Sequence, residues 1–295
     1  MRAGFVTVLG RPNVGKSTLI NKIVGSKVSI TSQRAQTTRH RILGIKTSSD
    51  AQIVLVDTPG LHKKITKTLN KVINKTARDS VEGVDLILMV ISAKGWHPDD
   101  DFPLSFIKGL KCPSILVINK IDMLRRKQEL LPFIESCRNK FAFTDFVPVS
   151  ARSGENVAHL EEVIGAKLPE GELYFPEEQL TDKGQRFMIA ELVREQLFRL
   201  LGQELPYSIA VDVEKFSVTP KITDINVNIW VEKSGQKAIV IGAKGEMLKK
   251  IGERSRLQME RIFDNKINLQ LWVKIRKGWA DNALALKGLG YQDEN

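Results

Sequence analysis

A nine-residue run near the start of the chain has the residue types that hold a row of phosphates. It consists of Gly10, Arg11, Pro12, Asn13, Val14, Gly15, Lys16, Ser17 and Thr18. Only glycines let several backbone N–H groups approach one phosphate at the start of a helix, so we expect Gly10 and Gly15 to shape such a loop. Lys16 would then reach the β- and γ-phosphates, and the Ser17 hydroxyl would bind Mg²⁺. A plain glycine turn is the alternative, but the helical stretch from 18 to 22 favours a phosphate-binding loop.

A carboxylate closes the hydrophobic stretch from 52 to 56 and begins a second motif, Asp57-Thr58-Pro59-Gly60. A charge at the end of an apolar strand is costly unless it faces a ligand, so we expect Asp57 to hold Mg²⁺ through a water molecule. Gly60 would donate its backbone N–H to the γ-phosphate. The tetrapeptide alone is typical of an ordinary turn, and its strand and its distance from the phosphate loop favour a nucleotide site.

The third motif, Asn119-Lys120-Ile121-Asp122, has the chemistry to distinguish guanine from adenine. The Asp122 carboxylate can accept from N1–H and the exocyclic amine of guanine, whereas adenine would leave it unpaired. For the motif on its own, a helix cap at Asp122 is the alternative. Ser150, Ala151 and Arg152 end the next strand, and a backbone N–H there could reach the guanine O6. The three motifs in this order predict a GTPase.

A polar stretch between the first two motifs predicts a segment that responds to the nucleotide. This switch segment comprises Gln36, Thr37, Thr38, Arg39, His40 and Arg41. A threonine here would bind Mg²⁺ only when the γ-phosphate is present, which couples the order of the segment to the nucleotide state. We favour Thr38 over Thr37 because Thr38 directly precedes the arginine, and a solvated basic loop is the alternative.

The position after the second motif holds Leu61, where many GTPases carry a glutamine that orients the attacking water. We therefore expect slow intrinsic turnover. Lys16, Mg²⁺ and backbone groups would stabilise the charge on the transferring phosphoryl group, and a partner or an extra cation would complete the site.

The composition indicates two folded domains. At about 150 residues per domain, 295 residues suggest two, and 42% hydrophobic with 27% charged residues is typical of globular chains. Two cysteines are too few for a disulfide framework, which predicts a reducing, cytoplasmic setting. The apolar runs are shorter than the roughly 20 residues of a membrane-spanning helix. A net charge of +11 favours a polyanionic partner, either nucleic acid or an anionic membrane surface.

Alternating strand-like and helical stretches over residues 1–170 predict an α/β domain, a mostly parallel sheet with helices on both faces. The expected strands are 5–9, 52–56, 86–91, 114–118 and 146–149. Each nucleotide motif follows one of these strands, at the edge where such sheets bind ligands. Two prolines and a glycine among acidic residues predict a linker over 171–182.

The pattern of residues 183–295 predicts a second, smaller domain. Asp182 would cap a helix, since the apolar residues from Phe187 to Leu201 recur at helical spacing. Strands are expected at 208–213, 225–231 and 267–275. A helix with Leu248, Ile251 and Met259 on one face would precede the last strand.

The tetrapeptide Gly242-Ala243-Lys244-Gly245 predicts a turn between two helices that binds RNA, because glycines let nucleotide phosphates come close to the backbone. Basic residues follow it, at Lys249, Lys250, Arg254, Lys274, Arg276 and Lys277. A charge run alone is usually a solvated face, and the glycine turn shifts the interpretation toward RNA. Trp279 is a candidate stacking platform for a base, and packing against the last strand is the alternative.

Taken together, these motifs resemble the translation-factor-related GTPases. The run from Gln36 to Arg41 and the tail Gly278-Trp279-Ala280-Asp281 are similar to the Era-like family. The resemblance implies a P-loop GTPase domain followed by an α+β type II KH domain. It further implies hydrolysis of GTP to GDP and phosphate, binding to 16S rRNA near its 3′ end, and a role in maturation of the small (30S) ribosomal subunit. Related GTPases with an asparagine at the position of Asn13 hold K⁺ there, and the family lacks the catalytic glutamine.

Two other functions remain as alternatives at this point. The chain could be a signalling GTPase whose second domain docks a protein or an anionic membrane surface. It could also be a kinase that uses ATP, which Asp122 disfavours. We expect a monomeric, cytoplasmic protein, and the sequence leaves open a peripheral contact with the cytoplasmic face of the inner membrane.

Overall fold

The computed structural model describes residues 1–32, 34, 37–59, 75–76, 79–202, 205–282 and 286–287, and these form two compact units. The first unit contains 1–31, 38–59, 75–76 and 79–182, and the second contains 32, 34, 37, 183–202, 205–282 and 286–287. Residues 171–182, predicted as a linker, therefore lie in the first unit. There Leu180 accepts a backbone hydrogen bond from Ile45, at 2.9 Å.

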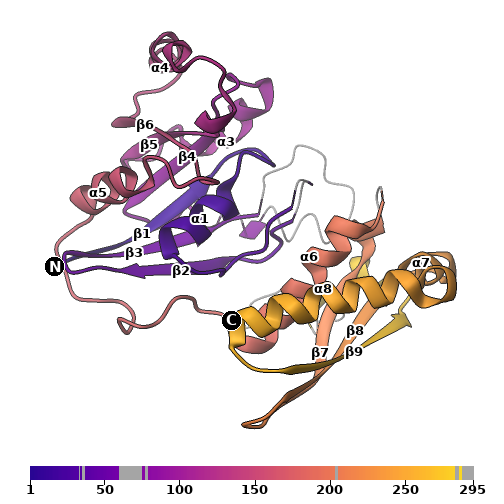
Figure 1. The fold of residues 1–295 in the computed structure, drawn as a ribbon. Helices are drawn as coiled ribbons and strands as arrows, with labels where there is room; N and C mark the ends of the chain where they lie inside the picture. Colours follow the sequence, from indigo (N-terminus) through magenta and orange to yellow (C-terminus); the bar gives the residue numbers. More distant parts are fainter. Residues whose placement is uncertain are drawn as a thin grey trace. The chain divides into compact units, whose positions relative to one another are not determined.

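A six-stranded sheet forms the centre of the first unit (Figure 1). Its strands are β1 (Arg2–Leu9), β2 (Ile42–Thr47), β3 (Ala51–Asp57), β4 (Leu86–Ser92), β5 (Ser114–Asn119) and β6 (Asp145–Val149), in the order β2-β3-β1-β4-β5-β6. All neighbours pair in parallel except β2, which runs antiparallel to β3. The predicted α/β class with a mostly parallel sheet is confirmed.

Strand β2 was not among the predicted strands. Gly44 explains why the sequence of this segment does not indicate a strand. A Cβ at Gly44 would lie 2.9 Å from Ile20 and 3.0 Å from Val24, two side chains of the helix above. Helix packing therefore requires a glycine in the middle of this strand, although glycine is a poor strand former.

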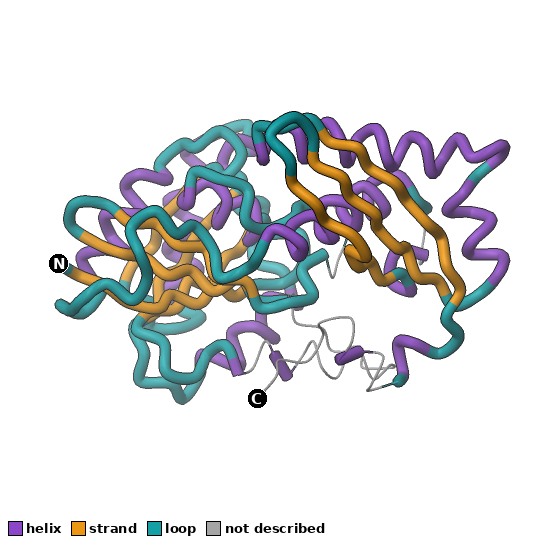
Figure 2. The backbone as a smooth tube through the Cα atoms, turned by 90° about the horizontal axis from the view of Figure 1, so that it is seen from below, coloured by secondary structure: helices purple, strands orange, loops and turns teal. Residues whose placement is uncertain are grey.

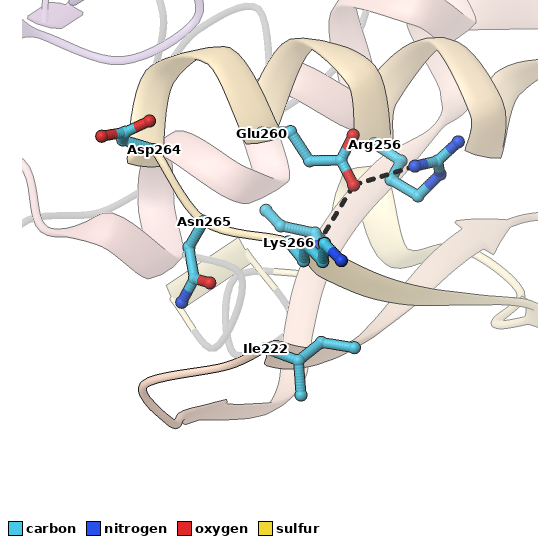
Figure 3. Close-up of a pocket in the computed structure, with 7 residues that line it drawn as sticks. Ile222, Arg256, Glu260, Asp264, Asn265 and Lys266 are labelled. Carbon is cyan, nitrogen blue, oxygen red and sulfur yellow. Dashed lines mark hydrogen bonds and ion pairs between the residues drawn. The ribbon is translucent and has the colours of Figure 1, made fainter.

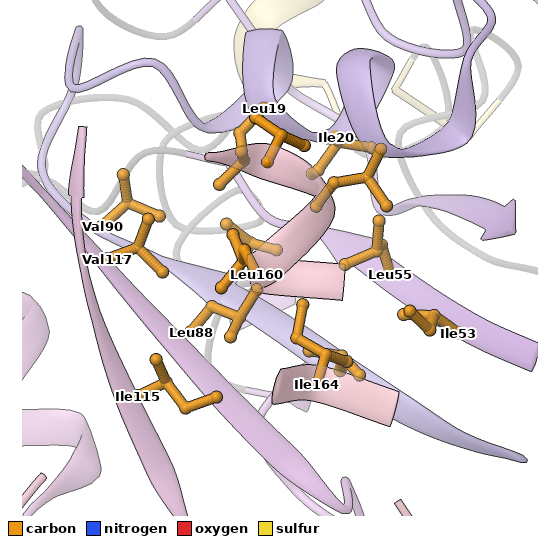
Figure 4. Close-up of a cluster of buried hydrophobic side chains, with 14 of the residues drawn as sticks. Leu19, Ile20, Ile53, Leu55, Leu88, Val90, Ile115, Val117, Leu160 and Ile164 are labelled. Atoms are coloured by element: carbon orange, nitrogen blue, oxygen red, sulfur yellow. The ribbon is translucent and has the colours of Figure 1, made fainter. Parts of the chain in front are cut away.

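Helices cover both faces of this sheet. They are α1 (Lys16–Val24), α3 (Asp101–Ile107), α4 (Leu130–Arg138) and α5 (Val157–Lys167). Figure 4 shows the cluster in which Leu19 and Ile20 of α1 meet Leu160 and Ile164 of α5 over the strands. Successive residues of β4 belong alternately to this cluster and to a second hydrophobic cluster on the opposite face of the sheet. Because both faces are buried, the central strands are continuous hydrophobic runs.

The second unit is a three-stranded sheet with helices on one face (Figure 2). In chain order it consists of α6 (Gln185–Leu200), β7 (Ala210–Val218), β8 (Thr223–Val231), α7 (Ser234–Ile241), α8 (Glu246–Phe263) and β9 (Ile267–Ile275). Strands β7 and β8 are antiparallel, and β8 and β9 are parallel. Side chains of α6 and α8, such as Leu197 and Met259, pack on Val227 and Ile229 of β8. The predicted α+β domain is confirmed.

The predicted cap of the first helix in this unit is wrong. Helix α6 begins at Gln185 after Gly184, and no side chain caps it. The Asp182 carboxylate instead accepts a hydrogen bond from the backbone N–H of Leu43, at 2.8 Å. Both residues lie in the first unit, where this bond ties residue 182 to β2. Among the described residues, none of the helices has the length and apolar character needed to cross a bilayer.

Candidate nucleotide-binding and RNA-binding sites

The loop between β1 and α1 has the backbone of a phosphate site. Gly10 and Gly15 have φ angles of 152° and 103°. A Cβ at Gly10 would lie 2.4 Å from the Val90 carbonyl, and one at Gly15 would lie 2.3 Å from Asn119 Nδ2. Both positions therefore require glycine, and α1 begins directly after the second one. The first backbone N–H groups of a helix attract anions, so the loop fits a phosphate chain.

Lys16 is the buried cation of this loop. Its Nζ donates to the backbone carbonyls of Gly10 at 2.8 Å and Arg11 at 3.1 Å. Burial lowers the pKa of Lys16 to about 8, against the opposing effect of the Asp57 charge. A buried ammonium gains from an anionic ligand, which replaces the water it has lost.

Three side-chain oxygens meet beside this loop. Ser17 Oγ lies 2.9 Å from Asp57 Oδ2 and 3.0 Å from Thr38 Oγ1, and Thr38 Oγ1 lies 3.4 Å from Asp57 Oδ2. The other carboxylate oxygen, Asp57 Oδ1, is buried with no hydrogen-bond partner among the described residues. Thr37 points elsewhere, since its hydroxyl donates to the carbonyl of Arg34. A buried carboxylate with one unpartnered oxygen, beside two hydroxyls that contact its other oxygen, fits a hard divalent cation such as Mg²⁺.

Ser29 also belongs to this cluster, although no sequence pattern predicted it. Its hydroxyl donates to Asp57 Oδ2 at 2.6 Å, while its backbone N–H donates to Asn21 Oδ1 at 2.9 Å. Burial raises the pKa of the Asp57 carboxyl, and hydrogen bonds such as the one from Ser29 oppose that rise. A single serine between two apolar residues has no motif to mark it.

The guanine motif is built onto the phosphate loop through Asn119. Its Nδ2 donates to the Val14 carbonyl at 2.8 Å, and its Oδ1 accepts from the backbone N–H groups of Lys120 at 2.7 Å and Ala151 at 2.9 Å. Lys120 has a positive φ of 70°, and its Nζ donates to the Asn13 carbonyl. One buried amide thus joins the loops that follow β1, β5 and β6.

Asp122 follows in a short 3-10 turn, and its side chain is exposed. The Ser150 hydroxyl donates to Asp122 Oδ1 at 2.7 Å and accepts from the Ser153 N–H at 3.2 Å. The carboxylate that we expect to read the base is therefore oriented by a serine. The sequence pointed only to a backbone N–H in this segment.

The other predicted nucleotide residues surround these clusters. Arg11 forms an ion pair with the buried Asp100, with Nε 3.0 Å from Oδ1, and Thr58 Oγ1 donates to the Val8 carbonyl. Asn13 and Arg152 are exposed, Pro12, Thr18 and His40 are half-buried, and Pro59 and Arg39 are buried. Gln36, Gly60 and Leu61 lie outside the described residues.

In the second unit, Gly242 ends α7 and Gly245 precedes α8. Their φ angles are 74° and 82°, and Lys244 between them has a φ of 50°. A Cβ at Gly242 would lie 2.6 Å from the Cβ of Met247, so this glycine lets the two helices approach closely. Ala243 and Lys244 are exposed at the tip of the turn. The geometry is that of a glycine turn open to a nucleotide backbone.

The predicted basic residues are not equally available to a ligand. Lys249, Lys250 and Arg254 are exposed on α8, and Arg276 and Lys277 are exposed after β9. Lys274 is half-buried and lies 3.3 Å from the Glu214 carboxylate, with its ammonium above the Trp230 ring. Its charge is therefore partly neutralised within the sheet.

The prediction that Trp279 stacks on a base is wrong. Its side chain is fully buried, and its Nε1 donates to the Ser208 carbonyl at 3.2 Å. A base has no face of this ring to contact. Trp272 of β9 is the exposed tryptophan of this region, with 54% of its surface accessible. Period-two alternation along β9 could have identified Trp272 as outward-facing.

A pocket of about 660 Å³ lies at the C-terminal end of α8, whereas the glycine turn precedes the N-terminal end of this helix. Figure 3 shows residues that line the pocket. Arg256 forms an ion pair with Glu260 at 2.8 Å, and the Ile267 N–H donates to the same carboxylate. These charges satisfy one another. We therefore do not count the pocket among the RNA-binding candidates.

Comparison with known proteins covers both units. Residues 5–120 match the family of 50S ribosome-binding GTPases, and residues 204–280 match the KH domain. The chain is 50% identical over 292 residues to GTPase Era of Pasteurella multocida, covering 99% of this chain and 95% of that protein. It is 49% identical over 292 residues to GTPase Era of Histophilus somni, with 99% and 97% covered.

Two solved structures are similar over the whole chain. One is a single-substitution variant of Aquifex aeolicus Era bound to GDP and AlF4⁻, and the other is Era in complex with MgGDPNP and nucleotides 1506–1542 of 16S ribosomal RNA. Each has a TM-score of 0.95 and 40% identity, covering 99% of this chain and 100% of the other.

Proposed function

The chain belongs to the Era family of GTPases and hydrolyses GTP, and from this we propose that it binds 16S rRNA near the 3′ end and assists maturation of the small ribosomal subunit. A GTPase relative of known structure binds this RNA segment, and the two chains align over their full lengths. The proposal assigns the same two ligands to the two units of this protein.

The observation that carries the nucleotide half is the buried Asn119 amide that joins the phosphate loop to the guanine motif. Lys16 would bind the β- and γ-phosphates, and Asp122 would accept from the guanine edge. Ser17, Thr38 and Asp57 would hold Mg²⁺, which neutralises charge on the phosphates when bound.

The RNA half rests on the Gly242-Ala243-Lys244-Gly245 turn and the exposed cations beside it. Close approach at the two glycines would let phosphates lie against the backbone, with Lys244 supplying a point charge. Lys249, Lys250 and Arg254 would extend this contact along α8. Arg276 and Lys277 are further candidates, whereas Lys274 would have to leave its pairing with Glu214.

Asn13 is the candidate ligand for K⁺ in this proposal. It has a positive φ of 64°, its side chain is exposed, and its carbonyl already accepts from Lys120. Lys120 occupies the backbone carbonyl of Asn13, whereas the side-chain amide oxygen is exposed beside the phosphate loop and can bind a cation. Replacing K⁺ by Na⁺ should lower the turnover of the full chain, and an Asn13→Ala variant should lose that difference between the two ions. Equal rates in both salts would remove K⁺ from the proposal.

We further propose that the protein acts as a monomer in the cytoplasm. A peripheral contact with the inner membrane would use the same exposed cations as RNA, so vesicles of anionic lipid should compete with RNA for the second unit. Sedimentation of the full chain with such vesicles, with and without RNA, tests that contact. Binding that RNA does not reduce would place the membrane contact elsewhere.

The test of the whole proposal is GTP hydrolysis by the purified chain with and without a single-stranded RNA resembling the 3′ end of small-subunit rRNA. RNA binding with a steep salt dependence is expected, about 0.7 log units per log unit of salt for each contacted phosphate. A scrambled RNA of the same length is the control. Hydrolysis without RNA binding would keep the GTPase assignment but reject RNA as the ligand of the second unit, and would favour a second unit that docks a protein.

A further inference from the structure

Ser29 lies in the loop that follows α1, within the first unit, and is 1% exposed. Its hydroxyl donates to Asp57 Oδ2 at 2.6 Å. We propose that Ser29 is a positioning residue for Asp57, that Asn21 of α1 in turn holds Ser29, and that this chain of contacts raises the affinity of the site for Mg²⁺. The inference rests on the proposed role of Asp57 in holding Mg²⁺.

The two oxygens of the Asp57 carboxylate have different surroundings. Oδ2 accepts hydrogen bonds from Ser29 and, at 2.9 Å, from Ser17, and it lies 3.4 Å from Thr38 Oγ1. Oδ1 is buried and has no hydrogen-bond partner among the described residues. Hydrogen bonds to one oxygen resist rotation of the carboxylate, so they leave the other oxygen available to the cation or to a water molecule bound to it.

Ser29 differs from the other two hydroxyls of this cluster. Ser17 and Thr38 are themselves proposed ligands of Mg²⁺, whereas Ser29 is placed to act on the carboxylate. Its contact with Oδ2, at 2.6 Å, is the shortest of the three. A group that bonds to a metal ligand orients that ligand, and loss of such a group typically lowers the metal affinity by roughly 10- to 100-fold.

Asn21 fixes the backbone that carries Ser29. Its Nδ2 donates to the Ser29 carbonyl at 2.7 Å, and its Oδ1 accepts from the backbone N–H groups of Val28 at 3.0 Å and Ser29 at 2.9 Å. Asn21 lies four positions after Ser17 on α1, so the two side chains share one face of the helix. This face of α1 therefore acts on Asp57 twice, directly through Ser17 and indirectly through Asn21 and Ser29.

The experiment measures the affinity of the full chain for GDPNP over a range of Mg²⁺ concentrations and in EDTA. Ser29→Ala should raise the Mg²⁺ concentration needed for half of the effect by roughly tenfold, because the carboxylate loses the hydroxyl that orients it. GDPNP binding in EDTA should be unchanged, since Ser29 acts through the cation. Ser29→Thr keeps the hydroxyl and should recover most of the Mg²⁺ affinity. An unchanged Mg²⁺ requirement in Ser29→Ala, or an equal loss of GDPNP affinity with and without Mg²⁺, would overturn the proposal.

Ser114→Ala is the matched control. Ser114 is 2% exposed, and its hydroxyl donates to the Cys112 carbonyl at 3.3 Å. It begins β5, whereas Asp57 ends β3, so the two residues lie at opposite edges of the parallel part of the sheet. This variant should leave the Mg²⁺ requirement unchanged.

A double-mutant cycle tests the role of Asn21. Asn21→Ala should also raise the Mg²⁺ requirement, and its combination with Ser29→Ala should need no more Mg²⁺ than Ser29→Ala alone, because Asn21 acts through that hydroxyl. Additive effects would reject Asn21 as the residue that holds Ser29. Asn21→Asp, which keeps an acceptor oxygen for both N–H groups, replaces the alanine variant in the cycle if that variant does not fold.

Asp57→Asn is measured in parallel to separate this inference from the proposed function. If it leaves the Mg²⁺ requirement unchanged, the cation role of Asp57 fails. A higher requirement in Asp57→Asn together with a wild-type requirement in Ser29→Ala rejects Ser29 alone.

Discussion

Asn119 and Val14 are joined by a hydrogen bond from the side-chain Nδ2 of the former to the backbone carbonyl of the latter, at 2.8 Å. The same amide accepts from the backbone N–H of Ala151 at 2.9 Å. The groups proposed to contact the phosphates and those proposed to contact the base are therefore fixed relative to one another by the protein's own hydrogen bonds. Preorganised donors lower the cost of ordering a site on binding.

We expect Asn119→Ala to weaken GDP and GTP binding together and to destabilise the protein by about 1 to 3 kcal/mol, because buried backbone groups of Val14 and Ala151 lose their partner. Nucleotide titration and chemical denaturation measure the two effects. Asn139→Ala, at an exposed position, is the control. A variant that loses stability but binds both nucleotides normally would show that the amide has no role in joining the loops.

Asp122→Asn should shift the base preference from guanine toward xanthine, since an amide can donate to the additional carbonyl of xanthine. Competition between GDP and XDP measures the shift. Ser150→Ala should weaken GDP binding more modestly, because it removes the hydroxyl that orients the Asp122 carboxylate. If guanine selectivity survives in the Asp122 variant, another group reads the base.

Affinity for GDP should fall as the pH rises above about 8, because burial lowers the pKa of Lys16 to about 8 in the free protein. Below that pH the ammonium is already charged and affinity should be constant. Above it, binding must first restore a proton, so the dissociation constant should rise by up to about tenfold per pH unit. In a Lys16→Arg variant the charge persists, so its weaker binding should not vary over this range. A flat wild-type profile to about pH 9.5 would contradict the prediction.

The parts of the site that could be predicted from sequence are those where one backbone conformation demands one residue type. Gly10, Gly15 and Gly242 each carry a positive φ and a neighbour too close for a Cβ. Such local requirements leave a motif in the sequence. The two domains could also be predicted, because the spacing of apolar residues along each strand and helix is a local pattern.

The residues that sequence reasoning missed depend on contacts between distant segments. Ser29 reaches Asp57, 28 positions later in the sequence, because β3 ends beside its loop. No local pattern distinguishes this serine from a solvated one. The prediction for Trp279 failed for the same reason, since its burial depends on packing against Ser208, 71 positions away in the sequence.

Trp279→Ala should destabilise the second unit by about 3 to 5 kcal/mol and leave the RNA affinity of the folded protein unchanged. The fully buried ring leaves a cavity when removed, and its hydrogen bond to the Ser208 carbonyl is lost. Trp272→Ala, at a position 54% exposed, should have a smaller effect on stability. Loss of RNA binding in a Trp279→Phe variant with wild-type stability would restore Trp279 as an RNA contact.

Arg254→Gln should weaken RNA binding and lower its dependence on salt by about 0.7 log units per log unit, the contribution of one phosphate contact on a single strand. Arg254 is exposed on α8, on the helix that follows the glycine turn. Lys221→Gln is the matched control, because it removes the same charge from the same unit at the exposed hairpin between β7 and β8. Titrations at several salt concentrations separate a lost contact from a change in overall charge, which would affect both variants alike. If the two slopes fall equally, RNA binding reflects the net charge of the second unit, and α8 does not hold the phosphates.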